Sequence, residues 1–107
     1  MANYLLIYKG GGMSETPEAG EAVMNAWMSW FGELGASVVD GGNPISVGAT
    51  IAADGSVSDG GASGVMGYSV LSASSLAEAT EKAKGCPHLG FGGSVEVYET
   101  FDPAAGA

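Results

Sequence analysis

An apolar run near the N-terminus sets the strongest constraint on the fold of this chain. Tyr4, Leu6 and Tyr8 alternate with Leu5 and Ile7. Because successive side chains of a strand point to opposite faces of a sheet, a strand over this run is apolar on both faces. Such strands belong to sheets that are covered on both sides. The fold must therefore supply cover for two sheet faces.

Two segments have the features of helices. Apolar residues recur with helical spacing between Pro17, a residue favoured in the first helical turn, and Gly35, a residue typical of helix ends. The spacing predicts a long helix over residues 17–34. A capping-box pattern at Ser75–Glu78 predicts a second, shorter helix that runs to about Lys84.

The remaining β-prone segments complete the order of elements. Short strands are predicted over residues 37–40, 65–71 and 95–99, and the pair Asp54-Gly55 predicts a hairpin within residues 45–58. The resulting βαββαβ order, with a β-hairpin insertion, is the ferredoxin-like pattern. It predicts an α+β fold in which a four-stranded antiparallel sheet has both helices on one face.

Two helices on one face leave the other apolar face of the sheet bare. We therefore expect a homodimer in which the sheets of two copies pack face to face, a dimeric α+β barrel. Residues 1–101 are expected to form the single domain, since 107 residues suit one compact unit. Residues 102–107 are expected to form a flexible tail.

The charge balance excludes several classes of partner. Twelve acidic residues stand against three lysines, which gives a formal net charge of −9. Nucleic acids and anionic membranes are therefore not expected as partners, because both require cationic side chains.

No basic, apolar leader and no apolar run of transmembrane length is present in the sequence. The single cysteine, Cys86, excludes an internal disulfide, so a cytoplasmic location is expected.

Six short motifs occur along the chain: YLLIY (residues 4–8), SDG (58–60), GYSV (67–70), SLAEA (75–79), GCPHL (85–89) and GGSVEV (92–97). Together they resemble the YCII-related protein family, in particular its DGPF-type branch. The resemblance implies a dimeric α+β barrel and, for some members, a catalytic His–Asp pair with its histidine near the first helix. Here residues 10–16 contain no histidine, and Gly61 and Ala62 stand where the motif has proline and phenylalanine.

His88 is the candidate catalytic residue, because it is the only histidine of the chain and histidine titrates near neutral pH. We expect Asp59, or else Asp40, to orient it for proton transfer in a lyase or isomerase reaction. The alternative is a structural histidine that contacts carbonyl groups at the end of the second helix. The corresponding alternative for the whole protein is a module that binds a small ligand or serves an accessory role, for instance in transcription, without catalysing a reaction.

Four residues are candidates for ligand binding: Tyr8, Trp27, Asp40 and Tyr68. Trp27 belongs to the apolar stripe of the long helix, where tryptophan is most often a core residue but can also wall a pocket between helix and sheet. Tyr8 and Tyr68 are expected on adjacent strands, with their hydroxyl groups toward a ligand. The methionines Met24 and Met28 lie on the flank of the same stripe.

No metal site or cofactor is expected from the sequence. No spacing of cysteine and histidine suits zinc, and no serine lies in a G-x-S-x-G motif. Cys86 follows the end of a predicted helix, a position typical of an inert, buried thiol rather than a nucleophile. The expected partners are a second copy of the chain and a small-molecule ligand.

Overall fold

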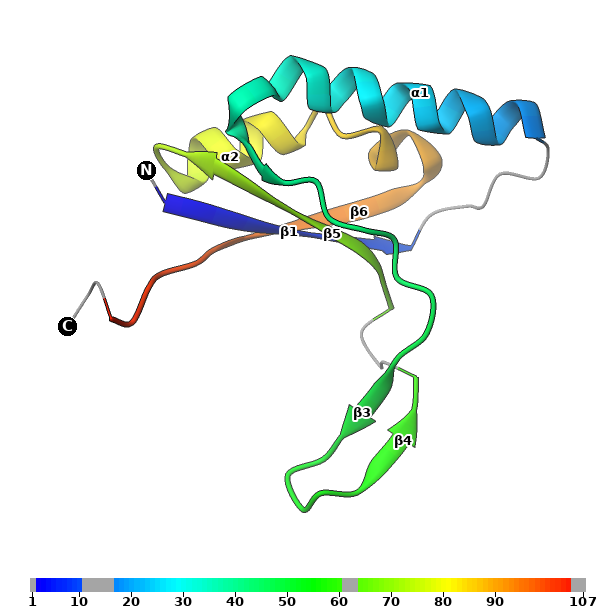
Figure 1. Ribbon diagram of the computed structural model, residues 1–107, viewed down its shortest axis with the longest axis vertical. Coiled ribbons are helices and arrows are strands. Elements are labelled where there is room, and N and C mark those ends of the chain that lie inside the picture. The colour runs from blue at the N-terminus through cyan, green and yellow to red at the C-terminus, as the bar shows by residue number, and fades with distance from the viewer. Residues whose placement is uncertain (1, 11–16, 61–63, 105–107) are drawn as a thin grey trace.

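The computed structural model describes residues 2–10, 17–60 and 64–104, and its fold belongs to the α+β class (Figure 1). The elements are β1 (Ala2–Gly10), α1 (Pro17–Leu34), the 3₁₀ turn η1 (Gly35–Ser37), β2 (Val38–Asp40), β3 (Ala49–Ile51), β4 (Val57–Asp59), β5 (Val65–Ala73), α2 (Leu76–Ala83), the 3₁₀ turn η2 (Pro87–Phe91) and β6 (Gly93–Glu99). The predicted bounds of α1 are confirmed. Strands β5 and β6 are each two residues longer than predicted, and β2 begins one residue later.

The main sheet has four antiparallel strands in the order β2-β5-β1-β6. The predicted number of strands and their antiparallel direction are confirmed. At its centre, Leu6 of β1 lies opposite Ser69 of β5 and Val97 of β6. Strands β3 and β4 pair with each other in a separate two-stranded sheet, so the predicted hairpin is confirmed. Figure 1 shows this hairpin, which we call the arm (residues 49–59), extending away from the main sheet.

The hydrophobic core lies between the main sheet and the two helices, both of which cover the same face (Figure 1). Leu6 and Leu71 are fully buried there, and the burial of each leucine side chain contributes about 1.5–3 kcal/mol to stability. Trp30 of α1 joins this core, and its indole Nε1 donates a hydrogen bond to the carbonyl of Lys82 in α2 at 3.3 Å. The two helices are thereby fixed side by side over the sheet.

The opposite face of the main sheet carries apolar side chains that no described helix covers. Leu5 lies opposite Val70, and Ile7 lies opposite Tyr68. These four residues are partly buried by their neighbours in the sheet, while Tyr98 of β6 is 50% exposed. We call this surface the open face. Strand β1 is thus apolar on both sides, as its sequence indicates.

The end of the chain beyond β6 packs against little else. Phe101 is 82% exposed, and Asp102–Ala104 are exposed as well. The tail predicted at residues 102–107 falls partly outside the described residues, which end at Ala104. Within residues 2–10, 17–60 and 64–104, no helix is long and apolar enough to cross a membrane.

Candidate functional site

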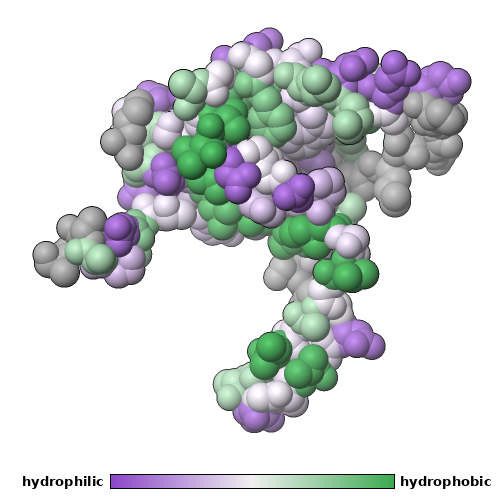
Figure 2. Space-filling model, in the orientation of Figure 1, coloured by the Kyte–Doolittle hydropathy of each residue, from purple (hydrophilic) through white to green (hydrophobic). Residues whose placement is uncertain are grey.

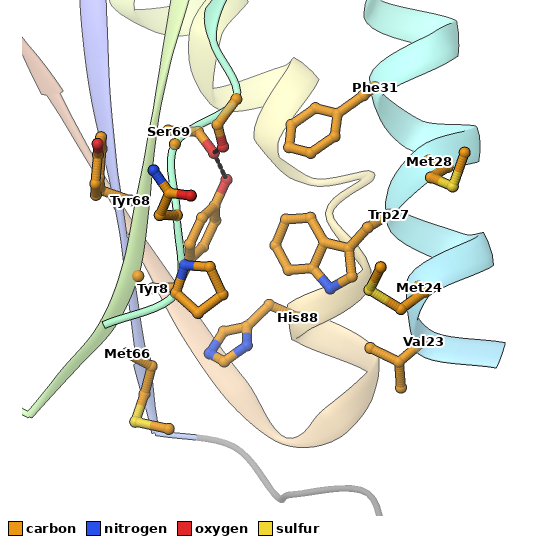
Figure 3. A pocket seen from close by; sticks show the side chains of 15 residues that line it. Tyr8, Val23, Met24, Trp27, Met28, Phe31, Met66, Tyr68, Ser69 and His88 are labelled. Carbon is orange, nitrogen blue, oxygen red and sulfur yellow. Dashed lines mark hydrogen bonds between the residues drawn. The ribbon is translucent and has the colours of Figure 1, made fainter. Parts of the chain in front are cut away.

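A cleft of about 460 Å³ opens between α1, the end of β1 and the loop that follows β2 (Figure 3). Its wall from α1 consists of Val23, Met24, Trp27, Met28 and Phe31, and its opposite wall includes Tyr8, Met66, His88 and the loop residues 41–44. This volume lies within the range of about 300–1,000 Å³ that is usual for small-molecule sites.

The helical period of α1 explains the aromatic wall of the cleft. Trp27 and Phe31 are one turn apart and therefore share a face of the helix, with ring centroids 5.8 Å apart. The ring of Trp27 also packs edge to face with the ring of Tyr8 on β1. Their centroids are 5.0 Å apart and the interplanar angle is 76°. At the mouth of the cleft, the side chains of Met24 and Met28 are 64% and 69% exposed. The wall thus combines rigid rings with flexible thioethers.

The hydroxyl group of Tyr8 holds the wall of the cleft in place. It donates a hydrogen bond to Ser69 Oγ at 2.7 Å, and Ser69 in turn donates to the carbonyl of Gly41 at 2.7 Å. Burial raises the pKa of Tyr8 above its ordinary value, and the hydrogen bond with Ser69 only partly opposes this rise. The hydroxyl therefore stays protonated at neutral pH. The Tyr8 proton is donated to Ser69, and the Ser69 hydroxyl in turn bonds to the loop after β2. The expected contact of the Tyr8 hydroxyl with a ligand stays a prediction.

His88 is presented to the cleft by the turn η2, which follows α2. Its Nε2 lies 2.9 Å from the carbonyl oxygen of Lys9. Because a carbonyl only accepts hydrogen bonds, Nε2 carries the proton and donates it. The ring lies 5.7 Å from that of Tyr8, and it covers Gly93 so closely that any side chain at this glycine would overlap it. His88 thus contacts a carbonyl of β1, not one at the end of α2.

The predicted pair of His88 and Asp59 is not formed. Asp59 lies in the arm, where it pairs with Ala49, and it does not line the cleft. Asp40 lies next to the cleft, but its carboxylate accepts a hydrogen bond from the backbone amide of Gly42 at 2.8 Å. It shapes the loop after β2 and does not orient His88.

Tyr8 and Tyr68 do not direct their hydroxyl groups to one ligand. Gly67 lies opposite Tyr8 in the sheet, and Tyr68 lies opposite Ile7. The two tyrosines therefore face opposite sides of the sheet, and the Tyr68 ring points away from the cleft (Figure 3). Its backbone carbonyl instead packs against Gly42. Tyr8, Trp27 and Tyr68 all line the cleft, but the rings of the two tyrosines lie on opposite sides of the sheet, so their hydroxyl groups do not converge on one ligand.

Sequence reasoning missed two parts of the site. Ser69 is fully buried and links Tyr8 to the loop after β2. Its place at a buried position of an alternating apolar strand is the signal that could have identified it, because a buried hydroxyl requires hydrogen-bond partners. The carbonyl of Lys9, which fixes His88, has no sequence signal, since every residue carries one.

The cleft and its surroundings offer little for covalent chemistry. Burial raises the pKa of the Cys86 thiol to about 11, although the backbone amide of His88 opposes this effect. The thiol is therefore protonated at neutral pH, which agrees with the inert, buried cysteine predicted from the sequence. In the described part of the chain, no group of three or more histidine, cysteine or carboxylate side chains could hold a metal ion.

No protein-family model, curated protein or solved structure matches this chain.

Proposed function

We propose that this protein binds a small, largely apolar molecule in the cleft between α1 and β1. The observation that carries the proposal is a wall of Tyr8, Trp27 and Phe31 around about 460 Å³ of space. Ligand sites of this size are mostly lined by apolar and aromatic side chains, with a few polar groups that orient the ligand. His88 supplies such a group at the edge of the cleft (Figure 3).

Binding without chemistry is better supported than a lyase or isomerase reaction. In a histidine-based proton transfer, a carboxylate beside the imidazole stabilises its protonated form. Among the described residues, the hydrogen-bond partner of His88 is the carbonyl of Lys9, and Asp59 lies in the arm. The geometry therefore favours the non-catalytic binding module over the enzyme.

Removal of the Trp27 ring is expected to weaken ligand binding. A neutral aromatic probe, 2,2-dimethyl-3-phenylpropan-1-ol, should bind the native protein in calorimetric titrations. Trp27→Leu keeps an apolar side chain but loses the aromatic contact, and the dissociation constant should rise about tenfold. Phe101→Leu is the matched control, since Phe101 is 82% exposed and does not line the cleft. Equal affinities of the two variants, or no binding by the native protein, would contradict the proposal.

We further propose that the domain is ferredoxin-like, is related to the YCII-type proteins that its motifs resemble, and pairs with a second copy. The strand order β2-β5-β1-β6, with a helix after β1 and another after β5, supports the ferredoxin-like topology. The open face supports the dimer, because an apolar sheet face is stabilised when another apolar layer covers it.

The arm has an apolar surface that would also contact a second copy of the chain. Ile51 lies directly opposite Val57 in the arm, and these residues are 71% and 66% exposed. Figure 2 shows hydrophobic residues, in green, on the surface of the arm. Four strands about 4.8 Å apart and about seven residues long present a face of about 400 Å². A stable dimer buries about 800 Å² on each partner. The arm would supply the remaining contact by reaching across to the second copy.

A further inference from the structure

We propose that the cleft selects small organic cations, such as quaternary ammonium compounds with a hydrocarbon body, over neutral and anionic molecules of the same shape. This inference rests on the proposed function, because it names the class of ligand that the same cleft would take. It follows from two independent observations: the aromatic composition of the wall and the arrangement of charges in the chain.

The first observation is the set of aromatic rings. The face of an aromatic ring attracts cations, and the attraction is strongest for tryptophan. Tyr8 and Trp27 meet edge to face, and Phe31 is tilted by 40° against Trp27. Tyr8 is only 5% exposed, whereas Trp27 and Phe31 are partly buried, so a compact cation in the cleft mainly contacts the rings of Trp27 and Phe31. The thioethers of Met24 and Met28 at the mouth are polarisable and adapt to ligands of different shape.

The second observation is that every lysine of the chain forms an ion pair outside the cleft. The chain has three lysines and no arginine, and each lysine forms an ion pair outside the cleft lining. Lys9 pairs with Glu96 at 4.0 Å, Lys82 with Glu78 at 3.4 Å, and Lys84 with Glu81 at 2.8 Å. An anionic ligand would therefore lose its hydration without gaining a lysine or arginine partner, which is unfavourable.

Acidic groups near the cleft favour a cation further. Asp40 directly precedes the loop residues 41–44 that line the cleft, and Glu21 lies one helical turn before Met24 on α1. The formal net charge of −9 adds a negative potential around the whole molecule. This potential raises the local concentration of cations and lowers that of anions.

Three probes of similar shape test the inference: benzyltrimethylammonium, 2,2-dimethyl-3-phenylpropan-1-ol and 2,2-dimethyl-3-phenylpropanoate. Each carries a benzyl group on a quaternary centre, which is nitrogen in the cation and carbon in the other two. They are titrated against the native protein at pH 8 in one buffer of fixed ionic strength. The cation should bind about fivefold more tightly than the alcohol. The carboxylate should bind about tenfold more weakly than the alcohol, or not at all.

The site of selection is tested with Trp27→Leu and the control Phe101→Leu. The preference for the cation over the alcohol should shrink in Trp27→Leu and stay unchanged in Phe101→Leu. If the alcohol binds but the cation binds no more tightly, the inference is overturned and the proposed function stands. The same holds if the carboxylate binds as well as the alcohol, or if Trp27→Leu leaves the preference intact. If none of the three probes binds, both the inference and the proposed function fail.

Discussion

Gly42→Ala is expected to lower the free energy of unfolding by about 3 kcal/mol or more, whereas Gly41→Ala should cost less than about 1 kcal/mol. Gly42 has a φ of +73°, and a Cβ atom built on it would overlap the backbone carbonyl of Tyr68. A backbone group cannot rotate away as a side chain can, so the loop or β5 would have to move. At Gly41 the nearest side chain, Phe31, is 3.9 Å from such a Cβ atom, which is an ordinary contact.

Urea unfolding curves of the two variants and of Gly60→Ala measure this difference. Gly60 also has a positive φ, +77°, but its Cβ position is open. Gly60→Ala therefore reports the cost of the backbone conformation alone, about 1–2 kcal/mol. If Gly42→Ala costs no more than Gly60→Ala, the close approach of the loop to β5, and with it the described wall of the cleft, is wrong.

Ile7→Lys is expected to convert the proposed dimer into a monomer. Ile7 lies on the open face, between Tyr68 of β5 and Glu96 of β6. Face-to-face packing would bury the added ammonium group of each copy. The dissociation constant of the dimer should therefore rise more than about 100-fold. In the monomer the lysine stays near Glu96 and solvent, so the fold should persist.

Sedimentation analysis at micromolar concentrations, together with circular dichroism, checks the dimer. Met28→Lys is the control for charge, because it adds the same ammonium group to an exposed residue of α1. The native protein and Met28→Lys should sediment as dimers, and Ile7→Lys as a folded monomer. A native protein that remains monomeric over this range would refute the dimer without affecting the cleft.

The elements of the fold could be predicted because their signals are local. The spacing of apolar residues in α1 gives its bounds, and Asp54-Gly55 marks the turn of the arm. The alternation in β1 likewise indicates two apolar faces. Each of these signals acts within a few residues, and the structure keeps all of them.

The parts of the site that depend on contacts between distant segments were not predictable in the same way. Tyr8 lies opposite Gly67 instead of Tyr68, and a shift of one residue in register moves a side chain to the other face. The motif predicts Asp59 beside His88, but Asp59 pairs with Ala49 in the arm, which extends away from the main sheet. Trp27 lines the cleft, and the period of α1 accounts for the helix face that it shares with Phe31.

The most direct test of the proposed binding site follows the two indole N–H signals of the protein by NMR. Trp27 lines the cleft, whereas Trp30 is 4% exposed and donates its indole hydrogen to the carbonyl of Lys82. On titration with 2,2-dimethyl-3-phenylpropan-1-ol, the Trp27 signal should shift in a saturable manner while the Trp30 signal stays in place. If the Trp27 signal does not move, or if only that of Trp30 moves, the cleft is not the binding site.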